Sequence, residues 1–243
     1  MATSSPTTPS AIDAPVEKAS APGIMNLATT YAAEAQALSE QMVTRLPAQV
    51  LATLDADAKH LDAIDFQSRI VQPGQLAPAF ALKNQRGEVV SLERLLAEGP
   101  VVLAFYRGEW CPYCNLQLRG YQRSIAEIRA LGARLVAVSP QTPDHSLSMA
   151  EKNDLDFDVL SDPGNDVASS FGLVFTMPAS TREIYLDLGN DLAEYNGEST
   201  WELPAPGTFV IARDGTTVFA RADGDYRKRT EPAEILEVLA RLR

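Results

Sequence analysis

The chain has few residues of the kinds that cross-link a fold, ligate metals or bind polyanions. Its 243 residues include two cysteines and two histidines, and 21 basic against 32 acidic side chains give a formal net charge of −11. A disulfide scaffold needs more cysteines than this, and binding to a nucleic-acid backbone needs clustered Lys and Arg. No apolar run approaches the roughly 18 residues of a membrane span. The sequence therefore predicts no nucleic-acid partner and no membrane segment.

The N-terminal 23 residues are rich in Ala, Ser, Thr and Pro, and this composition predicts a disordered tail. They lack the apolar core of a secretory signal. Asp13 and Glu17, with no arginine before Arg45, fit a mitochondrial transit peptide poorly. Two cysteines in a chain of this length also indicate a reducing compartment. We therefore expect a cytoplasmic protein.

Two regions that differ in their predicted secondary structure follow the tail. Residues 24–70 contain strong helix formers and predict a helical extension, which we expect to pack on the main domain or on a second subunit of a homodimer. Residues 71–243 alternate between strand and helix patterns, which predicts one α/β domain. The predicted strands are Val101–Tyr106, Arg134–Val138, Thr208–Ala212 and Thr216–Ala222. The predicted helices are Pro112–Leu131, Ser146–Asn153, Asn165–Phe171 and Pro232–Leu242, with a long loop over Thr176–Pro204.

The two cysteines lie three residues apart in Cys111-Pro112-Tyr113-Cys114, where an apolar strand gives way to an amphipathic helix. Pro112 suits the first helical position because it has no N–H to leave unpaired. The helix N-terminus favours a sulfur anion, so the pattern predicts a dithiol redox site. Arg107 and Arg119 would add positive charge. Glu109 would oppose it or would be a solvated turn residue.

Two other uses of the cysteines are weaker. Zinc would need two more ligands, and His60 and His145 are isolated and share no ligand spacing with the cysteines. A structural disulfide closing so short a loop would constrain the unfolded chain little. We therefore predict no metal and no cofactor, and we place His145 on the surface at a helix start.

Several segments in order resemble the thioredoxin-fold superfamily, and within it the peroxiredoxins of the alkyl hydroperoxide reductase/thiol-specific antioxidant family. The resemblance covers residues 71–243 and implies a thioredoxin-like fold, with a central mixed β-sheet flanked by helices. The segments that carry it are Gly74–Leu82, Gly87–Leu92, Leu135–Pro140, Phe157–Pro163 and Thr208–Ile211 with Asp214-Gly215.

The resemblance assigns roles at the site. The family motif Pro-x-x-x-Thr/Ser-x-x-Cys places the peroxide-attacking cysteine at Cys114, with Cys111 at the hydroxyl position and Arg107 at the proline position. The family's active-site arginine falls on Pro206. Thioredoxin-like reductases instead imply an attacking Cys111, a resolving Cys114 and a cis-proline at Pro206. An ordinary loop proline is the alternative at that position, and the resemblance favours cis.

We therefore predict a thiol peroxidase with a Cys111–Cys114 disulfide cycle, which reduces hydrogen peroxide or organic hydroperoxides and is recycled by a thioredoxin- or glutathione-type donor. Arg107 or Arg119 would replace the missing arginine. Tyr106, Trp110 and Tyr113 would wall the substrate pocket, and the charged stretch Asp223–Arg229 would be a solvated loop. The alternatives are a thiol–disulfide oxidoreductase with Cys111 as nucleophile and, with less support, a binding module with vestigial cysteines.

Overall fold

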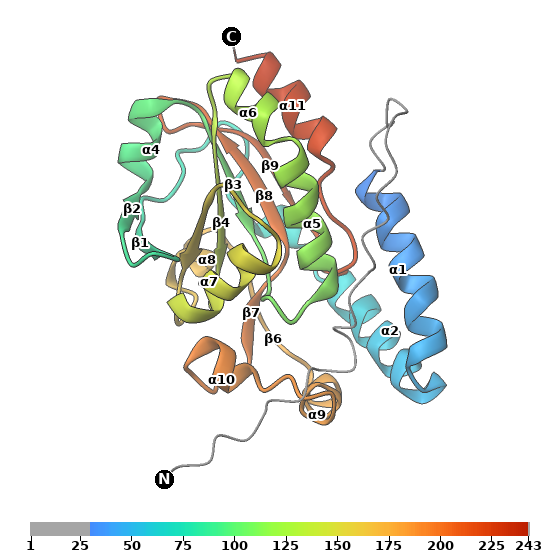
Figure 1. Cartoon of the computed structure of the whole chain (residues 1–243). Coiled ribbons are helices and arrows are strands. Elements are labelled where there is room, and N and C mark those ends of the chain that lie inside the picture. The colour runs from blue at the N-terminus through green and yellow to red at the C-terminus, as the bar shows by residue number, and fades with distance from the viewer. Residues whose placement is uncertain (1–29, 243) are drawn as a thin grey trace.

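A seven-stranded mixed sheet organises the chain, and the computed structural model describes residues 30–242 (Figure 1). The tail predicted over residues 1–23 lies outside the described residues. The strand order is β2-β1-β5-β4-β3-β8-β9, in which β3, β4 and β5 run parallel. The strands are β1 Ala81–Asn84, β2 Val89–Ser91, β3 Val101–Phe105, β4 Arg134–Ser139, β5 Asp158–Ser161, β8 Gly207–Ile211 and β9 Thr217–Ala222, and a separate ribbon pairs β6 Val174–Thr176 with β7 Glu202–Pro204. The four predicted strands are confirmed.

The central strand β3 is buried along its whole length, with all five residues fully shielded from solvent. An unbroken apolar run suits this position because helices or loops cover both faces of a parallel sheet centre. Phe105 at its end packs its ring against those of Phe171 and Phe209, with centroids 5.2 and 5.9 Å away. This aromatic cluster anchors the point at which the chain leaves the sheet toward the cysteines.

Helices α5, α6 and α11 lie in front of the sheet in Figure 1. The single helix predicted over Pro112–Leu131 is interrupted at Ser124, which leaves the helical region at ψ 8° and divides the segment into α5 and α6. The prediction of a long loop over 176–204 is wrong, because α9 and α10 fold within it. The helices are α1 Tyr31–Arg45, α2 Ala48–Asp62, α3 Phe66–Arg69, α4 Leu92–Glu98, α5 Pro112–Arg123, α6 Ile125–Ala130, α7 Pro143–Lys152, α8 Asp166–Ser170, α9 Ala179–Asp187, α10 Leu192–Asn196 and α11 Pro232–Ala240.

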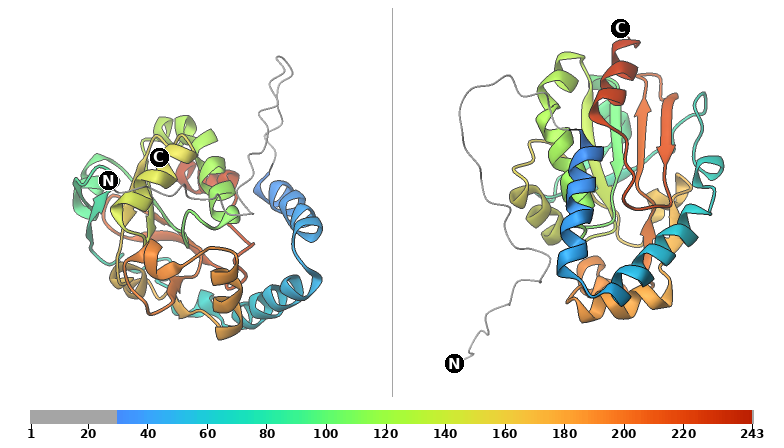
Figure 2. Two further views of the ribbon diagram at one scale, coloured as in Figure 1. Left: turned by 60° about the horizontal axis from the view of Figure 1, so that its bottom comes forward. Right: turned by 90° about the vertical axis from the view of Figure 1, so that its right-hand side faces the viewer.

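The first two helices are joined by a short connection and diverge as a V, which we refer to as the α1–α2 hairpin, and both contact the main domain rather than extending away from it (Figure 2). Helix α1 contacts α5, and α2 contacts α9. The hairpin therefore covers the end of the sheet at which β3 leads into α5. Among the described helices, none is both long and apolar enough to cross a bilayer.

Candidate active site

The connection from β3 to α5 places the two cysteines, as the sequence predicts. Cys111 is the N-cap of α5, Pro112 is its first residue, and the Cys114 N–H donates to the Cys111 carbonyl over 3.0 Å. Gly108 lets this connection fold tightly, because a Cβ atom there would lie 2.2 Å from the Trp110 indole nitrogen. Both sulfurs thus lie in the first turn of the helix, where unpaired backbone N–H groups favour negative charge.

Both cysteines are free thiols buried below the surface, with exposed fractions of 1% for Cys111 and 0% for Cys114. The Cys114 sulfur accepts a hydrogen bond from the Arg107 backbone N–H over 3.5 Å. It accepts a second from Arg229 Nη2 over 3.4 Å. The prediction that Asp223–Arg229 is a solvated loop is therefore wrong, because only Lys228 among these residues is exposed and Arg229 is buried against Cys114. Arg229 is the site residue that sequence reasoning missed.

Arg229 is itself held in one orientation. Its side chain is buried, its Nε donates to Gln117 Oε1 over 2.9 Å, and its Nη1 donates to the carbonyls of Tyr226 and Lys228. A guanidinium carries its donors in a rigid planar fork, so satisfying the other nitrogens aims Nη2 at the sulfur. The charge that we expected from Arg107 or Arg119 at Cys114 comes most directly from Arg229.

The surroundings shift the pKa values of the two thiols in opposite directions. Burial raises the pKa of the Cys114 thiol, but the hydrogen bond with Cys111 and the charges of Arg229 and Arg107 outweigh it and hold the pKa well below its ordinary value. Burial, the hydrogen bond and the charge of Cys114 raise the pKa of Cys111 well above its ordinary value. These opposite directions favour the thiolate form at Cys114 over the thiolate form at Cys111.

Arg107 lies in a cage of aromatic rings beside the cysteines. Its guanidinium carbon is 4.6 Å from the ring centroid of Tyr226, 5.0 Å from that of Trp110 and 5.8 Å from that of Tyr185. Its Nη2 donates to the Tyr185 hydroxyl over 2.8 Å, whereas Nε and Nη1 have no hydrogen-bond partner in the described part of the protein. A desolvated cation over aromatic faces is stabilised by the ring quadrupoles, so the cage can retain this charge in the interior.

A small cavity of about 40 Å³ adjoins Cys111. Its inner wall is made by buried side chains that include Arg107, Trp110 and Tyr185, and its outer rim by partly exposed apolar ones. The rim residues from the α1–α2 hairpin and from α9 onward are Met42, Leu46, Leu54 and Leu188. Cys114 does not line the cavity.

The structure brings some of the predicted site residues together and not others. Trp110 and Tyr113 line the cavity as expected. Tyr106 is completely buried and does not line it. Arg119 turns away and donates to Asn153 Oδ1 over 3.0 Å.

Pro206 also departs from expectation. None of the described peptide bonds is cis, so the prediction of a cis-proline at Pro206 is wrong. Its carbonyl instead accepts a hydrogen bond from the Asp223 N–H, and it does not line the cavity. An ordinary trans bond is sufficient here, because Pro206 lies in the short connection between the end of β7 and the first residue of β8.

Glu109 is not the solvated turn residue that was one of its two interpretations. Its carboxylate Oε1 lies 2.5 Å from His145 Nδ1, and its side chain is only 13% exposed. The ring of His145 packs against Tyr195 at 4.6 Å. His145 thus lies in the first turn of α7, close to the predicted helix start, but it is half-buried rather than a surface residue and links α7 to the loop that carries the cysteines.

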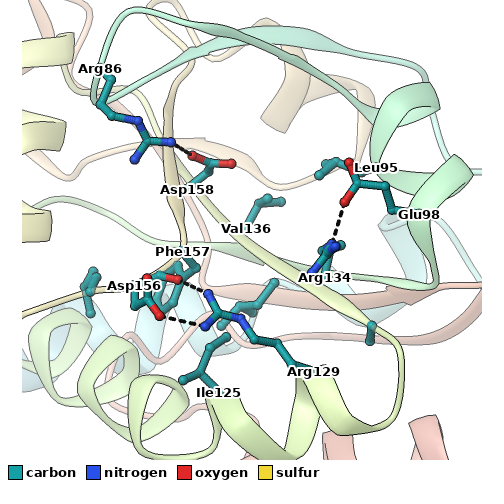
Figure 3. Close-up of a pocket in the computed structure, with 13 residues that line it drawn as sticks. Arg86, Leu95, Glu98, Ile125, Arg129, Arg134, Val136, Asp156, Phe157 and Asp158 are labelled. Atoms are coloured by element: carbon teal, nitrogen blue, oxygen red, sulfur yellow. Dashed lines mark hydrogen bonds and ion pairs between the residues drawn. The ribbon is translucent and has the colours of Figure 1, made fainter.

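A larger depression of about 370 Å³ lies at the opposite end of the parallel strands, by the first residues of β4 and β5 (Figure 3). Its charged side chains are paired with one another: Arg86 with Asp158 at 2.8 Å, Arg129 with Asp156 at 2.6 Å, and Arg134 with Glu98 at 2.7 Å. These arginines are neutralised, and neither cysteine lines the depression. We therefore assign the chemistry to the smaller cavity at Cys111.

A mixed sheet with a dithiol at the β3–α5 turn and an arginine against the second sulfur defines a peroxiredoxin-like thiol protein. The chain belongs to the AhpC/TSA family, which its residues 73–220 match over more than half of its length. It is 34% identical over 103 residues to a chloroplastic peroxiredoxin Q of Populus jackii, covering 42% of this chain and 48% of the relative. It is 37% identical over 100 residues to peroxiredoxin bcp of Haemophilus influenzae, covering 41% and 64%.

The chain thus spans about half to two thirds of the length of these curated relatives. Among solved structures, the peroxidoxin BcpB of Mycobacterium tuberculosis superposes with a TM-score of 0.56 at 24% identity. The match covers 71% of this chain and 99% of that one. A 2-Cys peroxiredoxin of Plasmodium vivax gives a TM-score of 0.55 at 13% identity, over 70% and 81%. These likenesses show that the fold is the thioredoxin-type fold.

Proposed function

We propose that the protein is a thiol peroxidase in which Cys114 attacks the peroxide and Cys111 resolves the product. The observation that carries this proposal is the 3.4 Å contact from Arg229 to the Cys114 sulfur, in a site where the Cys114 pKa is lowered. A thiolate is the nucleophile in such reactions, and a fixed guanidinium stabilises charge that develops beside it. Membership of the AhpC/TSA family supports the same chemistry.

The first half of the cycle oxidises Cys114 by two electrons. The thiolate attacks the terminal oxygen of ROOH, the O–O bond breaks, and RO⁻ leaves and takes a proton from water to become ROH. Cys114 becomes a sulfenic acid. The Cys111 thiol then attacks the Cys114 sulfur, an S–S bond forms, and the hydroxyl leaves as water with the Cys111 proton.

The second half restores the dithiol. A donor thiolate of the thioredoxin or glutathione type attacks one sulfur of the disulfide, and the other sulfur leaves as thiolate. Cys111 is the sulfur that adjoins the cavity, and Cys114 is the better leaving group because its lowered pKa stabilises the departing thiolate. The mixed disulfide therefore forms on Cys111, and a second donor thiol releases it.

The apolar rim of the cavity favours, as substrates, hydroperoxides that carry an apolar substituent. The cavity itself has room for a group about the size of a peroxide, and Leu46, Leu54 and Leu188 surround its mouth. An apolar substituent would remove these side chains from water and gain binding free energy in proportion to the area covered. Hydrogen peroxide would gain nothing from this rim.

Location in the cytoplasm and assembly as a homodimer stay predictions.

One observation favours the alternative function. Cys111, not Cys114, adjoins the cavity, which is the arrangement of a thiol–disulfide oxidoreductase whose Cys111 attacks a disulfide substrate. The raised pKa of Cys111 opposes this alternative, because the thiol form is a poor nucleophile.

The deciding experiment treats reduced Cys111→Ser and Cys114→Ser proteins with substoichiometric peroxide, with dimedone present to trap sulfenic acid, and locates the adduct by mass spectrometry. The peroxidase proposal requires rapid labelling at Cys114 in the Cys111→Ser protein and none in the Cys114→Ser protein. If the Cys111→Ser protein reacts no faster than a free thiol while the wild type reduces a disulfide, the alternative function replaces it.

A further inference from the structure

The segment that carries Arg229, residues 223–231, links β9 to α11, and we refer to it as the arginine segment. The main domain holds only part of it. The Tyr121 hydroxyl donates to the Thr230 carbonyl over 3.1 Å, and Gln117 accepts from Arg229. These two contacts come from α5, the helix that also bears Cys114.

The α1–α2 hairpin holds other residues of the arginine segment. Asp55 Oδ1 lies 3.0 Å from Arg227 Nη1, and the Asp62 carboxylate binds Lys228 Nζ at 2.8 and 3.0 Å. These two cations immediately precede Arg229 in the chain. Both carboxylates are on α2, so one helix fixes two successive residues next to the arginine.

Helix α1 adds a contact to the same backbone. The hydroxyl of Tyr31, a residue with only 4% of its surface exposed, donates to the Arg227 carbonyl over 2.7 Å. In return, the Glu231 carboxylate accepts from the backbone N–H groups of Tyr31 and Ala32 at 2.9 Å each, and so caps the start of α1. Each partner completes hydrogen bonds that the other would otherwise leave unmade.

The backbones also approach closely at the other end of the arginine segment. A Cβ atom on Gly224 would lie 2.0 Å from the Leu61 carbonyl oxygen, so only glycine fits against the end of α2. The arginine segment is thus fitted to the hairpin along most of its length. Neither the hairpin nor Arg229 lies within residues 73–220, the region that matches the family.

These contacts are better suited to positioning than to stability. The side chains of the Asp62–Lys228 and Asp55–Arg227 pairs are 31–51% exposed, and pairs that water reaches contribute little to the free energy of unfolding. They nevertheless restrict where residues 227 and 228 can be. A displacement of their backbone would carry the Arg229 guanidinium away from the sulfur, because its own Nη1 bonds to the carbonyls of 226 and 228.

We propose that the α1–α2 hairpin is a positioning element for Arg229, acting through Asp55, Asp62 and Tyr31, and that it thereby sets the thiolate fraction and reactivity of Cys114. The proposal rests on the function proposed above. Asp55, Asp62 and Tyr31 are positioning residues, since they reach the reacting sulfur only through the arginine segment.

The test compares three variants with the wild type. The Asp55→Asn/Asp62→Asn double variant removes both charged contacts, and Tyr31→Phe removes one hydrogen bond while keeping the buried ring. Glu34→Gln is the matched control, because Glu34 also ties the hairpin to the domain, through Arg123 at 2.8 Å, but does not touch the arginine segment. The readout is the pH profile of iodoacetamide alkylation at Cys114, resolved by mass spectrometry, alongside kcat/KM for a hydroperoxide.

The double variant and Tyr31→Phe should each move the alkylation inflection to higher pH and lower the rate at neutral pH severalfold. Glu34→Gln should match the wild type. Profiles for both test variants that coincide with the wild type would overturn the proposal. So would an equal shift in Glu34→Gln, which would indicate general loosening of the hairpin.

The same data separate this proposal from the function on which it rests. If the wild type reduces no hydroperoxide but the inflection still moves in the test variants alone, the positioning role holds and the peroxidase function fails. If the wild type reduces hydroperoxide and the inflection does not move, the peroxidase function holds and the positioning role fails.

Discussion

Arg229 and Cys114 are 115 residues apart in the chain, yet the guanidinium Nη2 lies 3.4 Å from the sulfur and both side chains are buried. The contact joins the first turn of α5 to the arginine segment that precedes α11. Burying a guanidinium is costly, and a hydrogen-bonded anionic partner offsets that cost. The nearby guanidinium favours negative charge on the sulfur, and four predictions follow from this arrangement and from its surroundings.

Removing the guanidinium should slow the reaction with peroxide. We expect Arg229→Met to lower the second-order rate constant for hydroperoxide by about a hundredfold or more, the size of effect seen when one fixed donor to a developing charge is lost. Stopped-flow tryptophan fluorescence would measure the rate. Arg129→Met, which breaks a surface ion pair with Asp156 at the far end of the sheet, should leave it unchanged. An Arg229→Met protein as fast as the wild type would show that the contact has no role in catalysis.

The reactivity of Cys114 should persist to acidic pH. Its pKa lies well below the ordinary value of about 8.5 for a thiol, so the thiolate remains populated at neutral pH and is lost only as the pH falls through the lowered value. Because the pKa of Cys114 is lower in the folded protein than in the unfolded chain, its thiolate adds to the free energy of unfolding at pH values above the pKa of the unfolded chain. This contribution is lost as the pH falls through the lowered pKa of the folded protein. Alkylation followed from acidic to alkaline pH should label Cys114 first and Cys111 only under alkaline conditions. The reverse order of labelling would refute the assignment of roles.

The cavity rim should control substrate preference. Replacing Leu46 with Asn should lower kcat/KM for cumene hydroperoxide by about tenfold, because the apolar contact with the substituent is lost, and leave hydrogen peroxide unaffected. Val43→Asn is the control, since Val43 lies in the last turn of α1, just before Leu46, but is 65% exposed and does not line the cavity. Equal losses on both peroxides in Leu46→Asn would rule out a rim that selects for substituents.

The aromatic cluster of Phe105, Phe171 and Phe209 beneath the site should contribute strongly to the stability of the protein. Phe209 is fully buried between Phe105 and Phe171, so Phe209→Ala should lower the free energy of unfolding by about 3–5 kcal/mol. Urea denaturation followed by circular dichroism would measure it. Leu76→Ala, at a residue 72% exposed, should change it by less than about 0.5 kcal/mol. A small loss at Phe209 would mean that the end of β3 is anchored elsewhere.

Local patterns in the sequence predicted the features that depend on neighbouring residues. The apolar run of β3, the turn with its Cys-Pro-Tyr-Cys motif and the start of α5 all follow from propensities and capping within a few positions, and the structure confirms them. The order of strand-like segments, read with the family resemblance, was sufficient for the fold. The break at Ser124 was missed because the apolar spacing continues across it.

Features that depend on distant parts of the chain were not predictable in this way. Arg229 stands in a mixed-charge stretch with no apolar pattern. Besides the nearby carbonyls of Tyr226 and Lys228, the partners that hold its buried side chain are Gln117 and Cys114, which lie more than a hundred residues away in the chain. The partnership of Glu109 with His145 has the same origin, since 36 residues separate the two. For Pro206 the resemblance itself was misleading, because it favoured a cis bond that the structure does not have. The arginine that the family has at this position is absent here, and the guanidinium next to Cys114 is that of Arg229, from another segment.

In the proposed cycle, the burial of both sulfurs makes the oxidation by peroxide and the reduction by the thiol donor differ in rate. A hydroperoxide brings a small reactive group, but a thiol donor has to align its sulfur with the S–S bond, and Cys111 is only 1% exposed. Part of the covering structure must move aside before that alignment is reached. Turnover at saturating peroxide should then rise with donor concentration only to a plateau, whose height reports the opening rate of the protein and is the same for every donor.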